Sequence, residues 1–508
     1  MGAPAVGGSA TPSTPAALEA RGWAWRHATR RRWALEDVAF RIEPGERVLL
    51  LGASGSGKST LLQGLAGVLG GDDEGEARGA LLVDGEVAAS VRGRVGLVLQ
   101  DPDSQAILAR VGDDVAFGCE NLGVPRAEIW QRVRAALDDV GLEVDLDRST
   151  SALSGGQKQR LALAGVLAMA PGAILLDEPT ANLDPAGVIE VRDAVTRALA
   201  KTGATLVVVE HRLDVWLPVV DRVIVLGGAG AGGVLADGTP DDVLHARGAE
   251  LASAGVWVPG IRPVVPPPPA RPAGDELLRG HELVVARRRG VPVAGPLQIS
   301  VRAGEVLGIT GANGSGKSTL GPTLAGLIPP ESGRVEASAL LSDGARGAPI
   351  SWSSRQLLTR IGTVFQDPEH QLLATTVRAE LAVGPRALGL PEELIAARVD
   401  ELLERLRLTA LAGANPYTLS GGEKRRLTVA ATLATRPRVI VLDEPTFGQD
   451  AATWAELVAI IAALRDGDGA GGAGGVGGDA PAAIVAISHD EEVLTALHAR
   501  RLPLDAPR

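Results

Sequence analysis

The stretch GASGSGKST at Gly52–Thr60 recurs as GANGSGKST at Gly311–Thr319. Each copy follows a short apolar run, RVLLLG at Arg47–Gly52 or EVLGITG at Glu305–Gly311. Glycines in such a loop let successive backbone N–H groups point at phosphate oxygens, and the N-terminus of the next helix adds partial positive charge. Both stretches therefore predict a strand, a phosphate-binding loop and a helix.

Further motifs recur in the same order after each loop. Lys58 matches Lys317 at an offset of 259 residues, and His211 matches His489 at an offset of 278. Between these two pairs the offset is constant at 266, in Gln100–Gln366, Ser154–Ser420 and Asp177–Asp443. Solenoid repeats have periods of roughly 20–50 residues, so this long period indicates the duplication of a whole domain.

Composition predicts how the 508 residues are divided. We expect a disordered tail rich in Ala, Pro and Ser over 1–21, because it has neither the basic start nor the apolar core of a signal peptide. A first domain over 22–254, a proline-rich linker over 255–275 and a second domain over 276–508 follow. The second domain contains a Gly-rich loop over 466–479. No run of 18 apolar residues occurs, so no membrane-crossing helix is expected.

Charge and cysteine content exclude some classes of protein. A net charge of −11 with a pI near 5.3 argues against nucleic-acid partners, which need a basic face. The single cysteine, Cys119, rules out an intrachain disulfide and fits a reducing cytosol.

The apolar pattern predicts an α/β fold. Runs such as AILLD and TLVVV in the first copy, and VIVLD and AAIVAI in the second, are apolar on both faces, as in parallel strands covered by helices. The middle of each copy, 114–141 and 380–408, has helical spacing and few strand signals. These segments predict an inserted helical subdomain.

The two loops supply most of the candidate nucleotide-binding residues. Lys58 and Lys317 would reach the β- and γ-phosphates, and the hydroxyls of Ser59 and Ser318 would bind Mg²⁺. The full set is Gly52, Ser54, Gly55, Gly57, Lys58, Ser59 and Thr60 in the first loop, and Gly311, Asn313, Gly314, Gly316, Lys317, Ser318 and Thr319 in the second.

A pair of carboxylates ends one strand of each copy, in AILLDEP (Ala173–Pro179) and VIVLDEP (Val439–Pro445). We expect Asp177 and Asp443 to hold the Mg²⁺ shell. The next residue, Glu178 or Glu444, would act as general base on the attacking water. Solvated acids at a strand end are the alternative interpretation, but both pairs lie at the same distance after a further motif.

That motif is LSGGQ in the first copy and LSGGE in the second. A serine and two glycines before an amphipathic helix make a helix N-terminus able to bind an anion, although LSGG alone is a common helix cap. Its place between a phosphate loop and an Asp-Glu pair makes it close to diagnostic. The candidate residues are Ser154, Gly155 and Gly156, and Ser420, Gly421 and Gly422.

With these motifs the chain resembles the nucleotide-binding subunits of ABC transporters, apart from the tail and the linker. The resemblance implies two tandem P-loop NTPase domains, each with a RecA-like core and a helical subdomain. It also implies ATP and Mg²⁺ as ligands, and a head-to-tail pairing of the two domains. The LSGG of one domain then covers the ATP held by the loop of the other.

The same resemblance assigns roles to two further pairs of residues. His211 and His489 would contact the γ-phosphate as catalytic residues, and Gln100 and Gln366 would link Mg²⁺ to a membrane partner. The family stacks an aromatic ring on adenine. Candidates are Trp23, Trp25 or His27 in the first copy, whereas the second offers only arginines such as Arg287 or Arg288.

Strings after each glutamine, QDPDSQAIL and QDPEHQLLATTV, look like the ATPases of energy-coupling-factor (ECF) importers, as do VEHRLD and PTFGQD. Those importers take up vitamins, vitamin precursors or metal ions. The resemblance implies a transmembrane coupling protein and a substrate-binding membrane protein as partners, and a peripheral position on the cytoplasmic face of the cell membrane.

Two other functions fit the same motifs. A twin-cassette ATPase acting on ribosomes usually carries a charged helical linker, which this chain lacks, and an exporter ATPase is generally fused to its membrane domain. The two ATP sites also differ. ANLD (Ala181–Asp184) becomes FGQD (Phe447–Asp450) and Glu210 becomes Ser488, so we expect unequal rates of hydrolysis.

Overall fold

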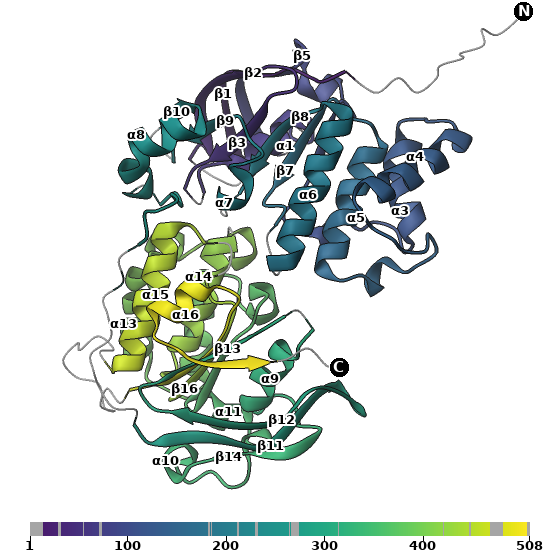
Figure 1. Cartoon of the computed structure of the whole chain (residues 1–508). Helices are drawn as coiled ribbons and strands as arrows, with labels where there is room; N and C mark the ends of the chain where they lie inside the picture. The colour runs from purple at the N-terminus through teal and green to yellow at the C-terminus, as the bar shows by residue number, and fades with distance from the viewer. Residues whose placement is uncertain are drawn as a thin grey trace, which may run out of the picture. The chain divides into compact units, whose positions relative to one another are not determined.

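A computed structural model gives the fold of the chain (Figure 1). It describes residues 14–28, 32–53, 55–70, 74–180, 183, 185–210, 213–228, 232–253, 255–263, 265, 274–312, 314–419, 421–446, 449–467 and 481–504. The chain divides into two compact units, one built mainly by residues up to Arg262 and the other mainly by residues from Pro263 on. Residues 1–13 of the expected tail, 264 and 266–273 of the expected linker, and 468–479 of the expected Gly-rich loop lie outside the described residues.

The first unit contains ten strands and eight α-helices among its described residues. The strands are β1 (Leu18–His27), β2 (Leu35–Ile42), β3 (Arg47–Leu51), β4 (Gly75–Val83), β5 (Glu86–Val87), β6 (Val95–Val98), β7 (Ala173–Asp177), β8 (Thr205–Val209), β9 (Arg222–Leu226) and β10 (Val234–Gly238). The helices are α1 (Lys58–Leu65), α2 (Pro102–Gln105), α3 (Val111–Asn121), α4 (Arg126–Asp139), α5 (Gly155–Ala168), α6 (Pro185–Thr202), α7 (Leu213–Trp216) and α8 (Pro240–Ser253).

The second unit repeats this order with small differences. Its strands are β11 (Glu276–Arg288), β12 (Val291–Arg302), β13 (Val306–Gly311), β14 (Ser332–Ala337), β15 (Ile361–Val364), β16 (Val439–Asp443), β17 (Ala483–Ile487) and β18 (Arg500–Leu504). Its helices are α9 (Lys317–Leu324), α10 (Ala339–Ser342), α11 (Ser354–Leu358), α12 (Val377–Ala387), α13 (Glu392–Arg405), α14 (Gly421–Leu433), α15 (Ala451–Asp466) and α16 (Glu491–Ala496).

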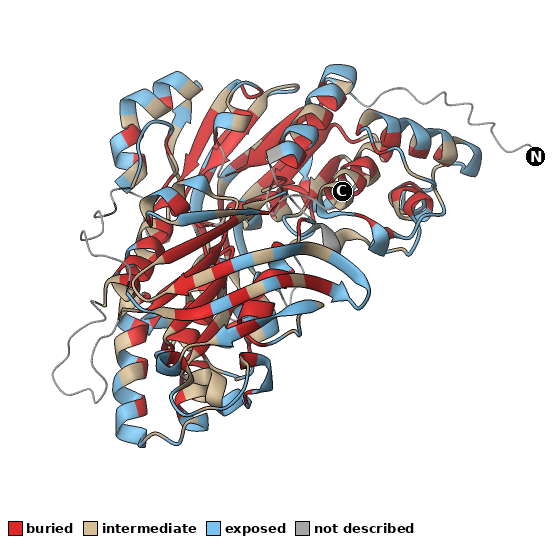
Figure 2. Ribbon diagram, turned by 60° about the horizontal axis from the view of Figure 1, so that its bottom comes forward, coloured by how far each residue is buried: buried red, intermediate tan, exposed pale blue. Residues whose placement is uncertain are grey.

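A central, mainly parallel sheet forms the core of each unit. Its strand order is β10-β9-β3-β8-β7-β6 in the first unit and β15-β16-β17-β13-β18 in the second. In β3, Val48 and Leu50 pack with α1 on one face, whereas Leu49 and Leu51 pack with α5 and α6 on the other. Both faces are therefore buried, as the continuous apolar runs predict (Figure 2). The expected α/β fold with two ABC ATPase domains is confirmed.

The helical segments expected in the middle of each copy are α3 and α4 in the first unit and α12 and α13 in the second. They pack against α5 and α14, the helices that begin at the LSGG motifs. A matching arginine in each unit links the second of these helices to the end of the LSGG helix. Arg132 of α4 donates to the Ala168 carbonyl at 3.3 Å, and Arg398 of α13 donates to the Ala434 carbonyl at 3.2 Å. The two helical subdomains are thus held in the same way.

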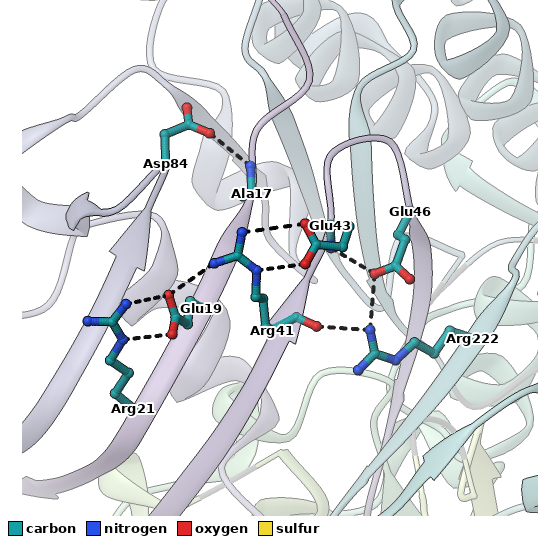
Figure 3. A network of polar contacts seen from close by, with 8 residues as sticks. All are labelled: Ala17, Glu19, Arg21, Arg41, Glu43, Glu46, Asp84 and Arg222. Carbon is teal, nitrogen blue, oxygen red and sulfur yellow. Dashed lines mark hydrogen bonds and ion pairs between the residues drawn. The ribbon is translucent and has the colours of Figure 1, made fainter.

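An antiparallel sheet, β2-β1-β4-β5 in the first unit and β12-β11-β14 in the second, was not foreseen from the sequence. On its outer surface in the first unit, Arg41 lies between Glu19 and Glu43, and Arg222 of β9 donates to the Arg41 carbonyl at 2.9 Å (Figure 3). Strand β1 begins at Leu18, inside the segment expected as a disordered tail, because Leu18 and Ala20 are buried in the core.

Candidate functional site

The two phosphate loops have the geometry that their glycines predict. Gly57 and Gly316, directly before α1 and α9, have φ angles of 87° and 93°, a left-handed conformation that suits glycine. A Cβ at Gly57 would lie 2.5 Å from the Leu35 side chain. Space and backbone angle therefore both require glycine at the start of these helices. Ser54 and Asn313 lie outside the described residues.

The loop lysines are buried and folded back over their loops. Lys58 Nζ donates to the carbonyls of Gly52 at 2.7 Å and Ala53 at 3.0 Å. Lys317 makes the same pair of bonds, to Gly311 at 2.7 Å and Ala312 at 2.8 Å. Burial lowers the pKa of Lys58, and the negative charges of Glu178 and Asp177 act in the opposite direction. Each ammonium is thus held against the backbone of its own loop.

The Asp-Glu pairs end the strands next to each loop lysine. Asp177 and Asp443 are the last residues of β7 and β16, with 5% and 8% of their surface exposed. Glu178 and Glu444 follow with φ angles of 47° and 51°. Left-handed backbone at two matching non-glycine residues is a strained arrangement of the kind that clusters at functional sites.

Burial changes the acidity of the second pair. It raises the pKa of Asp443 to about 6, against the effect of the Arg425 charge and of a hydrogen bond from Ser318. Burial, together with the charge of Asp443, raises the pKa of Glu444 to about 7. A carboxylate with a pKa near neutrality is suited to accept a proton at physiological pH.

Both glutamates accept hydrogen bonds. Gln100 donates from Nε2 to Glu178 Oε2 at 2.7 Å. Glu444 accepts the backbone N–H of His489 at 3.0 Å and the Ser488 hydroxyl at 3.2 Å. Glu210, the residue that matches Ser488, accepts the backbone N–H of Thr180 at 2.9 Å. The difference expected from Glu210 and Ser488 thus reaches the candidate general base of the second copy.

The residues near Lys317 fit a magnesium ion. Oδ1 of Asp443 is buried and has no hydrogen-bond partner in the described part of the chain, although the other side of the carboxylate takes the Ser318 hydroxyl. A hydroxyl and a carboxylate side by side are the oxygen ligands that Mg²⁺ takes together with substrate phosphates. Gln366, the other expected ligand, has an exposed side chain.

The LSGG motif starts a helix in both units. Ser154 caps α5 with a capping box, in which Gln157 N donates to Ser154 Oγ at 3.3 Å and Ser154 N donates to Gln157 Oε1 at 3.0 Å. In the second unit α14 begins at Gly421, whereas Ser420 lies outside the described residues. A Cβ at Gly155 or Gly421 would meet no atom within 4 Å, so both helix starts are open.

The histidines and aromatic residues can be placed only in part. His211 lies outside the described residues; His489 is half-buried, with Nε2 3.9 Å from Glu444 Oε1. Trp23 and Trp25 are 4% and 2% exposed in the core, which leaves their rings no free face for adenine. Half-buried His27, near Trp25, is the candidate that remains of the three, whereas Arg287 and Arg288 are exposed.

Sequence reasoning missed the residues that anchor the segment after each glutamine. Asp114 Oδ1 accepts the N–H groups of Ile107 and Leu108, both at 2.8 Å. Glu380 accepts those of Leu373 and Ala374 at 2.8 and 2.6 Å. The signal was present in the sequence, because Asp114 and Glu380 are acids at the same offset of 266 residues.

Comparison with known proteins identifies the family. Residues 35–181 and 295–447 each match the ABC transporter family. The chain belongs to this family. It is an ATP-binding subunit with two ABC domains, and the domains of this family are ATPases.

Relatives match along most of the chain. A Bacillus subtilis (strain 168) protein, YkoD, whose name describes an HMP/thiamine import ATP-binding protein, is 35% identical over 491 residues, covering 91% of this chain and 85% of its own length. A protein named as an ABC transporter ATP-binding protein from Methanosarcina acetivorans is 34% identical over 520 residues, covering 92% and 81%.

A solved structure shares the fold. The archaeal ribosome recycling factor aABCE1, in complex with ribosomal stalk protein aP1, matches with a TM-score of 0.59 at 20% identity, over 92% of this chain and 84% of that one. At this level of identity the match shows the fold alone.

Proposed function

We propose that this chain is the ATP-hydrolysing subunit of an ECF-type importer, with two ATP sites that each combine elements of both domains. The observation that carries the proposal is the repeated constellation inside each unit: a buried loop lysine, an Asp-Glu pair at the end of the neighbouring strand, and an open helix start at the LSGG motif. The first site joins Lys58, Asp177 and Glu178 to residues 420–422. The second joins Lys317, Asp443 and Glu444 to residues 154–156.

The residues divide the work of hydrolysis among them. The loop N–H groups and the lysine bind the β- and γ-phosphates, and the open helix start of the other domain binds the γ-phosphate from the far side. Glu178 or Glu444 takes a proton from the attacking water, and His211 or His489 contacts the γ-phosphate. Ser59 and Asp177, or Ser318 and Asp443, would hold Mg²⁺, which would supply positive charge against the phosphates.

The segment after each glutamine is the surface that we assign to the membrane partner. Ile107 and Leu373, at matching positions, are 61% and 77% exposed. The backbone N–H of each is held by the carboxylate of Asp114 or Glu380. The same segment is also tied to the preceding strand end, because Gln105 and Gln371 accept the N–H groups of Leu99 and Phe365 at 2.8 and 2.9 Å. Apolar side chains on an anchored segment suit an apolar helix of a coupling protein.

Import of a vitamin, a vitamin precursor or a metal ion is the transport reaction that we propose. The QDPDSQ and QDPEHQ strings support it, as does the import named for the Bacillus subtilis relative. None of the helices that the structure describes is long and apolar enough to cross a membrane, and in an importer of this type separate membrane proteins bind and pass the substrate.

Purification from its native membrane tests the proposal. The tagged chain is expected to bring down a transmembrane coupling protein, and Leu373→Asp together with Ile107→Asp is expected to reduce that recovery at least about tenfold. ATP hydrolysis by the purified chain alone is the control for folding of the variant. Recovery of ribosomes in place of membrane proteins would overturn the importer assignment.

A further inference from the structure

Arg425 makes contacts that join three functional segments of the second unit. It lies on α14, the helix that starts at the second LSGG motif. Its Nη2 donates to the carbonyl of Gln366 at 2.6 Å, and its Nη1 donates to the carbonyl of Phe365 at 2.7 Å. Nη1 also lies 3.4 Å from the carbonyl of Asp443. One guanidinium thus bridges the signature helix, the glutamine segment and the end of strand β16.

The environment makes this bridge rigid. Arg425 is 3% exposed, so its charged group is held away from water and depends on the carbonyls that it contacts. The planar guanidinium can donate to two neighbouring carbonyls at once, which a single amide or ammonium cannot do with the same geometry. The guanidinium therefore links α14 directly to the backbone of Gln366.

Among its described residues, the first unit shows no matching bridge. The residue that matches Arg425 is Gln159, on α5, which is also buried at 2% exposure. Its Nε2 has no hydrogen-bond partner within the part of the chain that the structure describes. The first unit thus has a neutral side chain at this position, without the hydrogen bonds that Arg425 makes.

We infer that Arg425 is a positioning residue that couples the two ATP sites through the second domain. This inference rests on the proposed function, in which α14 serves the site of Lys58 whereas Gln366 and Asp443 serve the site of Lys317. Closure of the α14 N-terminus on ATP at the first site then shifts the Gln366 backbone at the second. Because Gln159 makes no such bridge, coupling in the opposite direction through the first domain is weaker.

The test measures cooperativity in the full chain. Hydrolysis is followed against Mg-ATP concentration in the parent, Arg425→Gln, Arg425→Lys and Arg398→Gln. We expect the parent to show a Hill coefficient above about 1.5, and Arg425→Gln to lower it to about 1, with an intermediate value for Arg425→Lys. Arg398→Gln is the matched control, because it removes a guanidinium bonded to a carbonyl beyond the other end of α14, and it is expected to keep the parent value.

Two results would overturn the inference: a parent without cooperativity, or an Arg425→Gln chain as cooperative as its parent. If Arg398→Gln lowered the Hill coefficient as much as Arg425→Gln, this would also count against the inference, because both effects would then come from loosening of the helical subdomain. Failure of the proposed function is read separately. If the ATP sites were wrongly assigned, Glu178→Gln combined with Glu444→Gln would still hydrolyse ATP.

Discussion

Gln100 donates from Nε2 to Glu178 Oε2 at 2.7 Å, and the matching glutamate, Glu444, accepts the backbone N–H of His489 at 3.0 Å. Glu178 is half-buried, whereas Glu444 is 8% exposed. Glu444 also accepts the hydroxyl of Ser488, where the first copy has Glu210. We therefore expect the two ATP sites to be unequal.

Unequal hydrolysis is the first prediction. Glu178→Gln leaves only the site of Lys317 active, and Glu444→Gln leaves only the site of Lys58. We expect their residual ATPase rates to differ by at least about threefold, because Glu444 is more buried than Glu178 and has Ser488 beside it where the first copy has Glu210. Steady-state hydrolysis at saturating Mg-ATP measures both rates. Equal residual rates would contradict the prediction.

The raised pKa of Glu444, about 7, predicts a pH dependence of activity. The base form of Glu444 exists above this pKa. In the Glu178→Gln chain, hydrolysis is therefore expected to rise about tenfold between pH 6 and pH 8. A pH profile of kcat checks this. A flat profile over that range would show that the proton is not taken by Glu444.

The same raised pKa predicts an effect on stability. A carboxyl group with a pKa raised above its unfolded value stabilises the fold fully below about pH 4.5, and that contribution is lost as the pH rises through about 7. Glu444→Gln removes a buried anion, so we expect it to raise the free energy of unfolding at pH 8 by about 1–2 kcal/mol, which raises Tm by a few degrees. The effect is expected to be smaller at pH 5. Thermal unfolding without nucleotide measures this, with exposed Glu393→Gln as the control that leaves Tm unchanged.

The loop glycines predict a contrast between two substitutions. Gly55 and Gly57 both have left-handed φ angles, 77° and 87°, but an added Cβ meets nothing at Gly55 and Leu35 at Gly57. Gly55→Ala is expected to cost about 1 kcal/mol of stability from backbone strain alone. Gly57→Ala is expected to cost about 1–3 kcal/mol more, because it also overpacks the contact with Leu35. Equal losses would mean that Leu35 moves freely.

The anchor of the partner surface gives a further prediction. Glu380 is 4% exposed and accepts two backbone N–H groups next to Leu373. Glu380→Gln replaces an oxygen with an N–H donor, and we expect it to lower recovery of the coupling protein several-fold while ATP binding by the chain stays within twofold. Loss of ATP binding to the same extent would place Glu380 in general folding and not in the partner surface.

The sequence predicts the central sheet and its helices well because short local patterns mark each of these elements. Runs apolar on both faces identify β3, β7 and β8, and the glycines and LSGG motifs mark the starts of α1 and α5. The antiparallel sheet was missed. Strand β1 pairs with β2, the next strand along the chain, and with β4, which lies much further on, and register shifts in both pairings interrupt the alternation that would mark a strand.

The candidate site was predicted in its residues but not in its contacts. Lys58, Asp177 and Glu178 could be identified from motif order, whereas the hydrogen bond from Gln100 and the buried bridge of Arg425 depend on packing between distant segments. The adenine candidates show the same limit. Trp23 and Trp25 have the right type and position, but alternation along β1 and a bulge direct both side chains into the core.

In the proposed function each ATP site is completed by the LSGG motif of the other domain, and substitutions at Gly155 and Gly421 test this pairing directly. Both begin helices in open space, so an aspartate fits the fold and even favours the helix N-terminus, but its charge would repel ATP phosphates. In the Glu178→Gln chain, where only the site of Lys317 is active, ATPase activity is measured with Gly155→Asp or Gly421→Asp added. We predict that Gly155→Asp abolishes the remaining hydrolysis and Gly421→Asp spares it. The reverse pattern would show that the motifs do not pair across the two domains in this way.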